Sequence, residues 1–210
     1  AKIYPDAADK FHAVPNPYVH PDMLVAGERR SARDRQHPPR LLCVGRIAAQ
    51  KDYMTLLSAL ALIVDRPWSM TILGDGPLLE DTKRRAEVLG IAERIEFKGF
   101  VADVTSYLER SDILVLSSYW EGFPAVPIEA MATGCAVVAT DCSEGLTELL
   151  QQIDVKTVPV RDPAALSRAI GEAMASPQPV DRLRACAAIY SIENSVDEHL
   201  RLLNQLCPIS

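Results

Sequence analysis

The sequence predicts an α/β protein with a doubly wound parallel sheet of about six strands, Rossmann-like, and helices on both faces. Short apolar runs alternate along the chain with segments of helical spacing, and this order is typical of parallel strands joined by right-handed helical crossovers. The runs are continuously apolar, which indicates strands that are buried on both faces. Hydrophobic residues make up 48% of the 210 residues, enough to fill such a core without disulfides or metal sites.

Predicted strands and helices alternate along the chain up to residue 160. The strands are the apolar runs 40–45, 68–74, 94–99, 112–118, 135–140 and 155–160. The helices, recognised by apolar residues at helical spacing, are 52–65, 77–90, 104–111, 126–134 and 143–150, followed by 162–176, 179–191 and 195–206. Gly90 and Gly134 stand at two of the helix ends, where a left-handed residue stops a helix.

Residues 1–39 differ from the rest of the chain. Proline interrupts the segment AVPNPYVHPDM, and the segment GERRSARDRQHPPR is charged with almost no apolar residues. We therefore expect residues 1–39 to form an interdomain linker or arm that is flexible around residues 28–39. One domain then covers residues 40–210.

Charge, cysteine content and hydropathy exclude several classes of protein. The net charge of −6 disfavours a nucleic-acid partner, which needs a basic face. The five cysteines are odd in number and include no C-x-x-C pair, so we expect buried, reduced thiols in a cytoplasmic protein. No His or Asp cluster with metal-ligand spacing occurs. Neither a signal peptide nor an apolar span is found, so the chain is not expected to cross a membrane, although it can lie against one.

Two cations follow the first predicted strand, at the edge of the sheet where such folds bind ligands. Arg46 comes directly after this strand, and Lys51 lies at the start of the next helix. A cation pair beside a helix N-terminus suits a diphosphate, although two solvated surface cations are an equal alternative. The segment LGDGP is not a dinucleotide fingerprint, because Leu79 stands where the third glycine is needed.

Two carboxylates lie on either side of a proline-rich bend after the fourth predicted strand. Glu121 precedes the bend, and Glu129 falls in the first turn of the following helix, close to Pro127. Glu129 could accept two ribose hydroxyls, with Glu121 aimed next to the phosphates. By spacing alone, a helix-dipole role for Glu129 and a surface charge at Glu121 are favoured. Val101, after the third strand, could offer its backbone to a base or simply form a loop.

Taken together, the motifs resemble the C-terminal, donor-binding domain of GT-B glycosyltransferases of family 4, the retaining "glycosyl transferases group 1". The resemblance covers about residues 13–205. The matching pieces, in the order of the family, are VPNP, VGRI…QKD, ILGDGP, FKGFV, SDILVLSSYWEGFP and PIEAMATGCAVVATD. One departure is Leu146, which replaces the proline of the Gly-Pro-x-Glu sequence that the family often has, and this puts the donor sugar in question.

The resemblance assigns the candidate residues to parts of a nucleotide-sugar donor. It implies that Arg46 and Lys51 hold the diphosphate and offset the charge of the leaving group, so that no metal or other cofactor is needed. The remaining implied roles are Glu121 for the donor sugar, Glu129 for the ribose, Val101 for the base, and the backbone N–H groups of Phe123, Ala125 and Val126 for the phosphates.

The resemblance also implies a missing half, because GT-B enzymes have two domains with the active cleft between them. We expect this chain to be the donor-binding half of a hexosyltransferase of polysaccharide biosynthesis, inactive without the N-terminal acceptor domain. The implied acceptor is a glycan or lipid-linked sugar, which allows peripheral contact with the inner face of the membrane. A non-catalytic nucleotide-sugar-binding module is the alternative, and an NAD-dependent dehydrogenase is disfavoured by the missing fingerprint.

Overall fold

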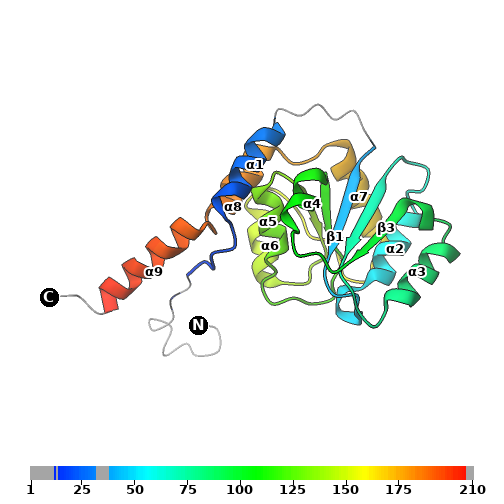
Figure 1. Ribbon diagram of the computed structural model, residues 1–210, viewed down its shortest axis with the longest axis horizontal. Coiled ribbons are helices and arrows are strands. Elements are labelled where there is room, and N and C mark those ends of the chain that lie inside the picture. Colours follow the sequence, from blue (N-terminus) through cyan, green and yellow to red (C-terminus); the bar gives the residue numbers. More distant parts are fainter. Residues whose placement is uncertain (1–11, 13, 32–37, 207–210) are drawn as a thin grey trace.

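The computed structural model describes residues 12, 14–31 and 38–206. Within these residues, parallel strands form one sheet in the order β3-β2-β1-β4-β5 (Figure 1). The strands are β1 (Arg40–Val44), β2 (Ser69–Leu73), β3 (Ile95–Gly99), β4 (Ile113–Leu116) and β5 (Ala136–Ala139). The predicted fold class is confirmed. The strand order reverses between β1 and β4, and open sheets of this kind bind ligands at such a reversal.

Helices cover both faces of the sheet (Figure 1). The α-helices are α1 (Pro21–Ser31), α2 (Tyr53–Ala61), α3 (Leu79–Val88), α4 (Thr105–Arg110), α5 (Val126–Ala132), α6 (Glu144–Gln151), α7 (Pro163–Ala175), α8 (Val180–Ala188) and α9 (Ile192–Leu206). Two short 3₁₀ helices, η2 (Ala49–Lys51) and η3 (Ala92–Arg94), lie between them.

The core has two parts because successive residues of a strand point to opposite faces. Leu41 and Cys43 of β1 pack with side chains of α2, α3 and α7 on one face. Leu42, between them, packs with side chains of α4, α5, α6 and α8 on the other face. Every residue of β4 and β5 is buried. Burial on both faces is the physical reason why these segments are continuously apolar.

The predicted sixth strand, 155–160, is present only as a single bridge beside β5. Val158 pairs with Thr140 in parallel, donating its N–H to the Ala139 carbonyl at 3.0 Å and accepting the Asp141 N–H at 2.7 Å. Two residues later the chain turns at Val160 and Arg161, where Arg161 has a left-handed backbone (φ 59°), so the pairing with β5 ends. The sheet therefore has five strands among the described residues.

The segment that was expected to be an arm contains helix α1, which packs on α4, α5 and α8. Just before the helix, Val19 is fully buried and donates its N–H to the Tyr190 carbonyl at 3.0 Å. The helix begins at Pro21, a residue that fits a first helical turn. The sequence concealed α1 because prolines precede it and its second half is charged. Residues 32–37, in the segment expected to be flexible, lie outside the described residues.

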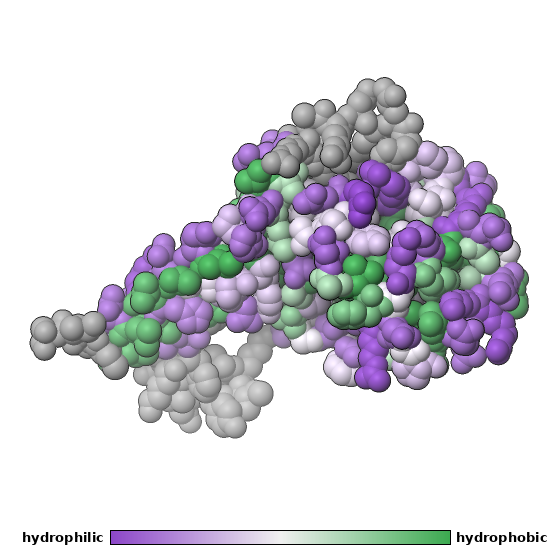
Figure 2. Space-filling model, viewed as in Figure 1, coloured by the Kyte–Doolittle hydropathy of each residue, from purple (hydrophilic) through white to green (hydrophobic). Residues whose placement is uncertain are grey.

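Helix α9 begins at Ile192, three positions before the expected start at residue 195, and extends away from the sheet (Figure 1). An apolar stripe runs along it in Figure 2. The stripe consists of Ile192, Val196, Leu200, Leu203 and Leu206, which are 38% to 60% exposed. In the part of the chain that the structure describes, no helix has both the length and the apolar content required to span a membrane.

Cys43, Cys135, Cys142 and Cys186 are buried and form no disulfide, in agreement with the expected thiols. Cys207 lies outside the described residues. Burial raises the pKa of Cys43 to about 11, so its thiol stays protonated and unreactive near neutral pH.

Candidate functional site

Glycine turns stack closely at the carboxyl ends of β1, β2 and β3. Gly74 donates its N–H to the Gly99 carbonyl at 2.7 Å and has a φ of 136°. A Cβ atom on Gly74 would lie 2.0 Å from the Gly45 carbonyl oxygen, which no side chain can tolerate. The glycines therefore serve close packing between neighbouring turns, and they shape the floor of the site described below.

Lys51 is the last residue of η2, and only Asp52 separates it from α2. Asp52 has a left-handed backbone (φ 44°), and its side chain caps α2 by accepting the Thr55 N–H at 3.1 Å. Ser117, at the end of β4, donates its hydroxyl to the Lys51 carbonyl at 2.8 Å. These contacts fix the lysine backbone from both sides of the strand reversal. Lys51 is thus held at the carboxyl edge, where the sequence placed it.

The Lys51 side chain reaches across the strand reversal to Glu121. Its Nζ lies 2.5 Å from Glu121 Oε1, and the two side chains are only 18% and 11% exposed. The backbone N–H of Glu121 donates to the Cys142 carbonyl at 2.7 Å, which holds the loop after β4 against the loop after β5. The structure thus joins the residue expected to bind phosphate to the residue expected to bind sugar, a contact that the sequence did not predict.

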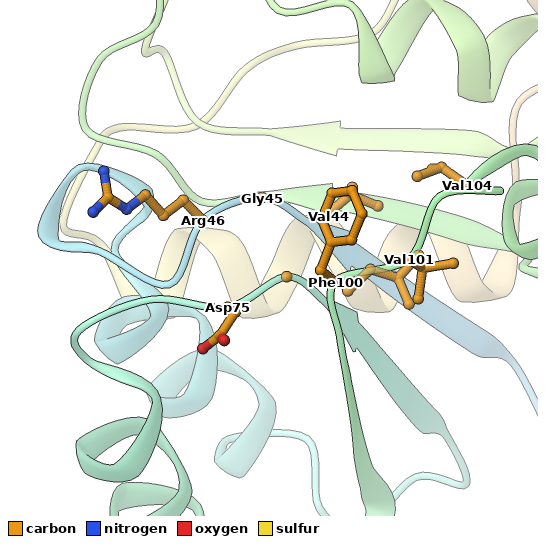
Figure 3. A pocket seen from close by; sticks show the side chains of 9 residues that line it. Val44, Gly45, Arg46, Asp75, Phe100, Val101 and Val104 are labelled. Carbon is orange, nitrogen blue, oxygen red and sulfur yellow. The ribbon is translucent and has the colours of Figure 1, made fainter.

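A pocket of about 400 Å³ opens between the ends of β1 and β2 and the loop after β3 (Figure 3). Val44, Leu73, Phe100, Val101 and Val104 provide its apolar walls. Figure 3 shows Arg46 and Asp75 projecting at one end, away from the apolar side chains. The pocket is therefore apolar inside with charged groups at one end, and Val101, for which the resemblance implies a contact to the base, is one of its lining residues.

The bend between Glu121 and α5 presents unpaired N–H groups. Among the described residues, no protein acceptor takes the backbone N–H of Phe123, Ala125 or Val126. The side chain of Phe123 is held separately: its ring packs against Tyr190 and Tyr18, at centroid distances of 5.5 and 6.2 Å. Because the ring anchors the bend, its backbone donors stay available for an anion. These are the three residues for which the family resemblance implies phosphate contacts.

A second, polar hollow of about 530 Å³ lies on the other side of Glu121. Its lining residues are Glu121, Asp141, Cys142, Ser143, Glu144, Thr147, Glu148 and Gln151. Ser143 caps α6 here by accepting the Leu146 N–H at 3.4 Å, and Leu146 itself is buried. Leucine in place of the family's proline therefore leaves a regular helix start beside the hollow.

Glu129 lies in the first turn of α5 and is half-buried. Burial raises the pKa of its carboxyl group above the ordinary value, because the apolar surroundings disfavour the charged form. Within the part of the chain that the structure describes, this carboxylate forms no ion pair, and it does not take part in the contact between Lys51 and Glu121. The two carboxylates that the sequence placed around the bend therefore have different surroundings.

We expect Glu129→Gln to raise the midpoint temperature of thermal unfolding at pH 7 and to leave it unchanged at about pH 3.5. Because the pKa of Glu129 is higher in the folded chain than in the unfolded chain, ionisation of its carboxyl group lowers the free energy of unfolding at pH 7. This cost vanishes at low pH, where the carboxyl group is protonated in the folded and the unfolded chain alike. Differential scanning calorimetry at the two pH values tests this, with exposed Glu87→Gln as the control. A midpoint that falls at pH 7, or rises equally at both pH values, would contradict the prediction.

Two residues of the site were missed from the sequence. Gln50 precedes Lys51 and donates through Nε2 to Glu121 Oε2 at 3.3 Å, and Ser118 donates its hydroxyl to Glu121 Oε1 at 2.7 Å. Their neighbours in the motifs QKD and SSYWEG were the only available signal. Among the described residues, no group of three His, Cys, Asp or Glu is placed to hold a metal ion.

Comparison with known proteins gives matches over most of the chain. A family model described as "Glycosyl transferases group 1" matches residues 38–176. A Haemophilus influenzae protein named "Uncharacterized glycosyltransferase" is 35% identical over 113 residues, 53% of this chain and 32% of the relative. The Rhizobium meliloti "Lipopolysaccharide core biosynthesis mannosyltransferase LpsB" is 39% identical over 106 residues, 47% of this chain and 30% of the relative. The matched region spans about a third of each of these relatives.

Solved structures with the same fold include a glycosyltransferase from Rickettsia africae. It superposes with a TM-score of 0.77 at 18% identity, over 96% of this chain and 59% of the other. The Anabaena protein HepE, solved in complex with UDP, superposes with a TM-score of 0.72 at 19% identity, over 90% of this chain and 54% of the other. At these identities the likeness concerns the fold.

Proposed function

Because this chain belongs to the group 1 glycosyl transferases, we propose that it is the donor-binding half of a retaining, GT-B-type glycosyltransferase. It binds a nucleotide-diphosphate sugar, and the whole enzyme moves the sugar to a glycan or lipid-linked acceptor. The observation that carries the proposal is the meeting of Lys51 with Glu121 beside the unpaired N–H groups of the bend. Cationic and N–H donors for a diphosphate thus lie next to a carboxylate that can accept sugar hydroxyls.

The surroundings of the site support a place for each part of the donor. The base enters the apolar pocket at Val101, and the ribose hydroxyls donate to Glu129. The diphosphate lies among Lys51, Arg46 and the N–H groups of Phe123, Ala125 and Val126. The donor sugar occupies the polar hollow beside Glu121, whose carboxylate and hydroxyl groups can form hydrogen bonds with the hydroxyls of a sugar.

The chemical step depends on where negative charge develops. As the bond between the sugar and the diphosphate breaks, charge grows on the leaving diphosphate, and Lys51 and Arg46 offset it. The unpaired N–H groups of the bend add fixed dipoles without reorganisation during the reaction. We propose that these groups supply enough positive charge for a metal-independent reaction, with Glu121 holding the sugar so that transfer retains the anomeric configuration.

The acceptor side is proposed to lie on an N-terminal domain of a longer protein. The matched region covers about a third of the relatives described above, one of which is named as a mannosyltransferase of lipopolysaccharide core biosynthesis. We propose a role in polysaccharide assembly in the cytoplasm, at the inner face of the membrane, with peripheral contact only. The isolated chain then binds the donor but transfers no sugar.

Calorimetric titration of the purified chain with UDP, GDP, ADP and NAD tests the proposal. We expect one of the nucleoside diphosphates to bind and NAD to give no signal. Modest affinity is expected because domain closure cannot add contacts in this chain. Binding of NAD in preference to all three diphosphates, or of none of the four, would overturn the proposal. Sugar transfer by the isolated chain would overturn the assignment of the acceptor site to another domain.

A further inference from the structure

Glu121 has two neutral hydrogen-bond donors in addition to Lys51, one from each side of the strand reversal. The Ser118 hydroxyl donates to Oε1 at 2.7 Å, and the Gln50 side-chain amide donates to Oε2 at 3.3 Å. Each carboxylate oxygen therefore has a neutral donor of its own. Such an arrangement fixes the plane of the carboxylate, which a single cation on one oxygen cannot do.

Gln50 also holds the loop that carries Glu121. Its side-chain Nε2 donates to the Trp120 carbonyl at 2.9 Å, and its backbone carbonyl accepts the Tyr119 N–H at 2.8 Å. Because Gln50 is the neighbour of Lys51 in η2, one residue ties the turn expected to bind phosphate to the loop expected to bind sugar. Hydrogen bonds of Gln50 therefore connect the turn that carries Lys51 to the loop that carries Glu121.

Ser118 is fixed at least as firmly. The residue is fully buried at the end of β4, and its carbonyl accepts the Thr140 hydroxyl at 2.6 Å. With the backbone held between β4 and β5, the Ser118 hydroxyl is kept within reach of Glu121. Its donation does not depend on any group that a ligand would attract.

A bound diphosphate would compete with Glu121 for Lys51. The lysine ammonium lies 2.5 Å from Glu121, and a diphosphate carries more negative charge than one carboxylate. As Lys51 turns to the phosphates, Glu121 would be left as a carboxylate that is only 11% exposed. A buried carboxylate without donors is costly and free to reorient, unless other donors remain.

We propose that Gln50 and Ser118 are positioning residues that keep Glu121 aimed at the donor sugar when Lys51 moves to the diphosphate. The inference rests on the proposed function and deepens it. The neutral donors Gln50 and Ser118 are not attracted to the diphosphate as the Lys51 ammonium is. Their hydrogen bonds to Glu121 therefore persist when the donor binds. Lys51 is then free to serve the diphosphate without loss of the sugar-binding geometry.

Affinities for matched ligand pairs test the inference in the purified chain. Calorimetry with UDP and UDP-glucose, and with GDP and GDP-mannose, gives the preference for a sugar nucleotide over its bare diphosphate. Gln50→Ala and Ser118→Ala should each lower sugar-nucleotide affinity by about threefold to tenfold, the range for one neutral hydrogen bond. Affinity for the bare diphosphate should stay within about twofold. Gln152→Ala, at an exposed glutamine, is the matched control for Gln50→Ala.

A double-mutant cycle separates positioning from a general structural role. In a Glu121→Ala background, Gln50→Ala and Ser118→Ala should cause no further loss, because they act only through Glu121. An undiminished loss in that background would overturn the inference, as would equal losses for sugar nucleotide and bare diphosphate. So would an unmodified chain that binds diphosphates without any preference for a sugar. Failure of the unmodified chain to bind any nucleotide would instead overturn the proposed function, on which the inference rests.

Discussion

Replacing Lys51 by Ala is expected to weaken the binding of a nucleoside diphosphate by about tenfold to a hundredfold, as for a hydrogen bond between charged groups. The ammonium group lies at the strand reversal, beside the unpaired N–H groups of the bend, and it is only 18% exposed. Its interaction with a diphosphate is therefore less screened by solvent than that of a surface lysine. Calorimetric titration with the diphosphate that the unmodified chain prefers measures the effect.

Lys156→Ala provides the matched control, because Lys156 is exposed and lines a different pocket. It removes the same charge and should change affinity by less than about twofold at moderate salt. Thermal unfolding should be followed in parallel, since Lys51→Ala removes the ion pair of Glu121. Equal losses from the two lysine substitutions would show that the diphosphate is attracted only by overall charge and is not held by Lys51.

Glu129→Ala and Glu121→Ala are expected to act on different parts of the donor. Glu129→Ala should weaken binding of the bare nucleoside diphosphate by about tenfold or more, because hydrogen bonds from the ribose to a charged acceptor are lost. Glu121→Ala should not weaken it, because the bare diphosphate has no sugar. The ion pair sharpens this expectation: removal of Glu121 also removes the carboxylate that competes with the phosphates for Lys51.

Titration of both variants with the bare diphosphate and with its sugar nucleotide distinguishes the two roles. Glu121→Ala should reduce only the extra affinity that the sugar provides, whereas Glu129→Ala should reduce both affinities together. Exposed Glu87→Ala serves as the charge-matched control. If Glu121→Ala lowers affinity for the bare diphosphate as much as Glu129→Ala does, the assigned roles are wrong.

Some elements were difficult to predict for local reasons. The sixth strand was predicted from the apolar residues of 155–160, but the chain turns at Val160 and Arg161 after a single bridge to β5. Helix α1 was hidden among prolines and charges, and it is recognisable only through its packing on α4, α5 and α8. In both cases a backbone or tertiary contact outweighed the local pattern.

The sequence by itself determined the α/β class, the succession of β1 to β5 along the chain, and the set of residues that follow their carboxyl ends. These features are local, because periodicity and turn residues act within a few positions along the chain. Arg46, Lys51, Glu121 and Glu129 could therefore be selected as candidates without coordinates. Their motifs also matched those of a family.

Only the tertiary structure decided which of these residues meet. The strand order places β1 beside β4, so Lys51 and Glu121 come into contact although they are 70 residues apart. The same neighbourhood brings Gln50 and Ser118 onto one carboxylate and leaves Glu129 half-buried elsewhere. Strand order arises from the packing of the whole sheet, and no local pattern encodes it. For that reason the sequence could select candidate residues for the site but not the contacts between them.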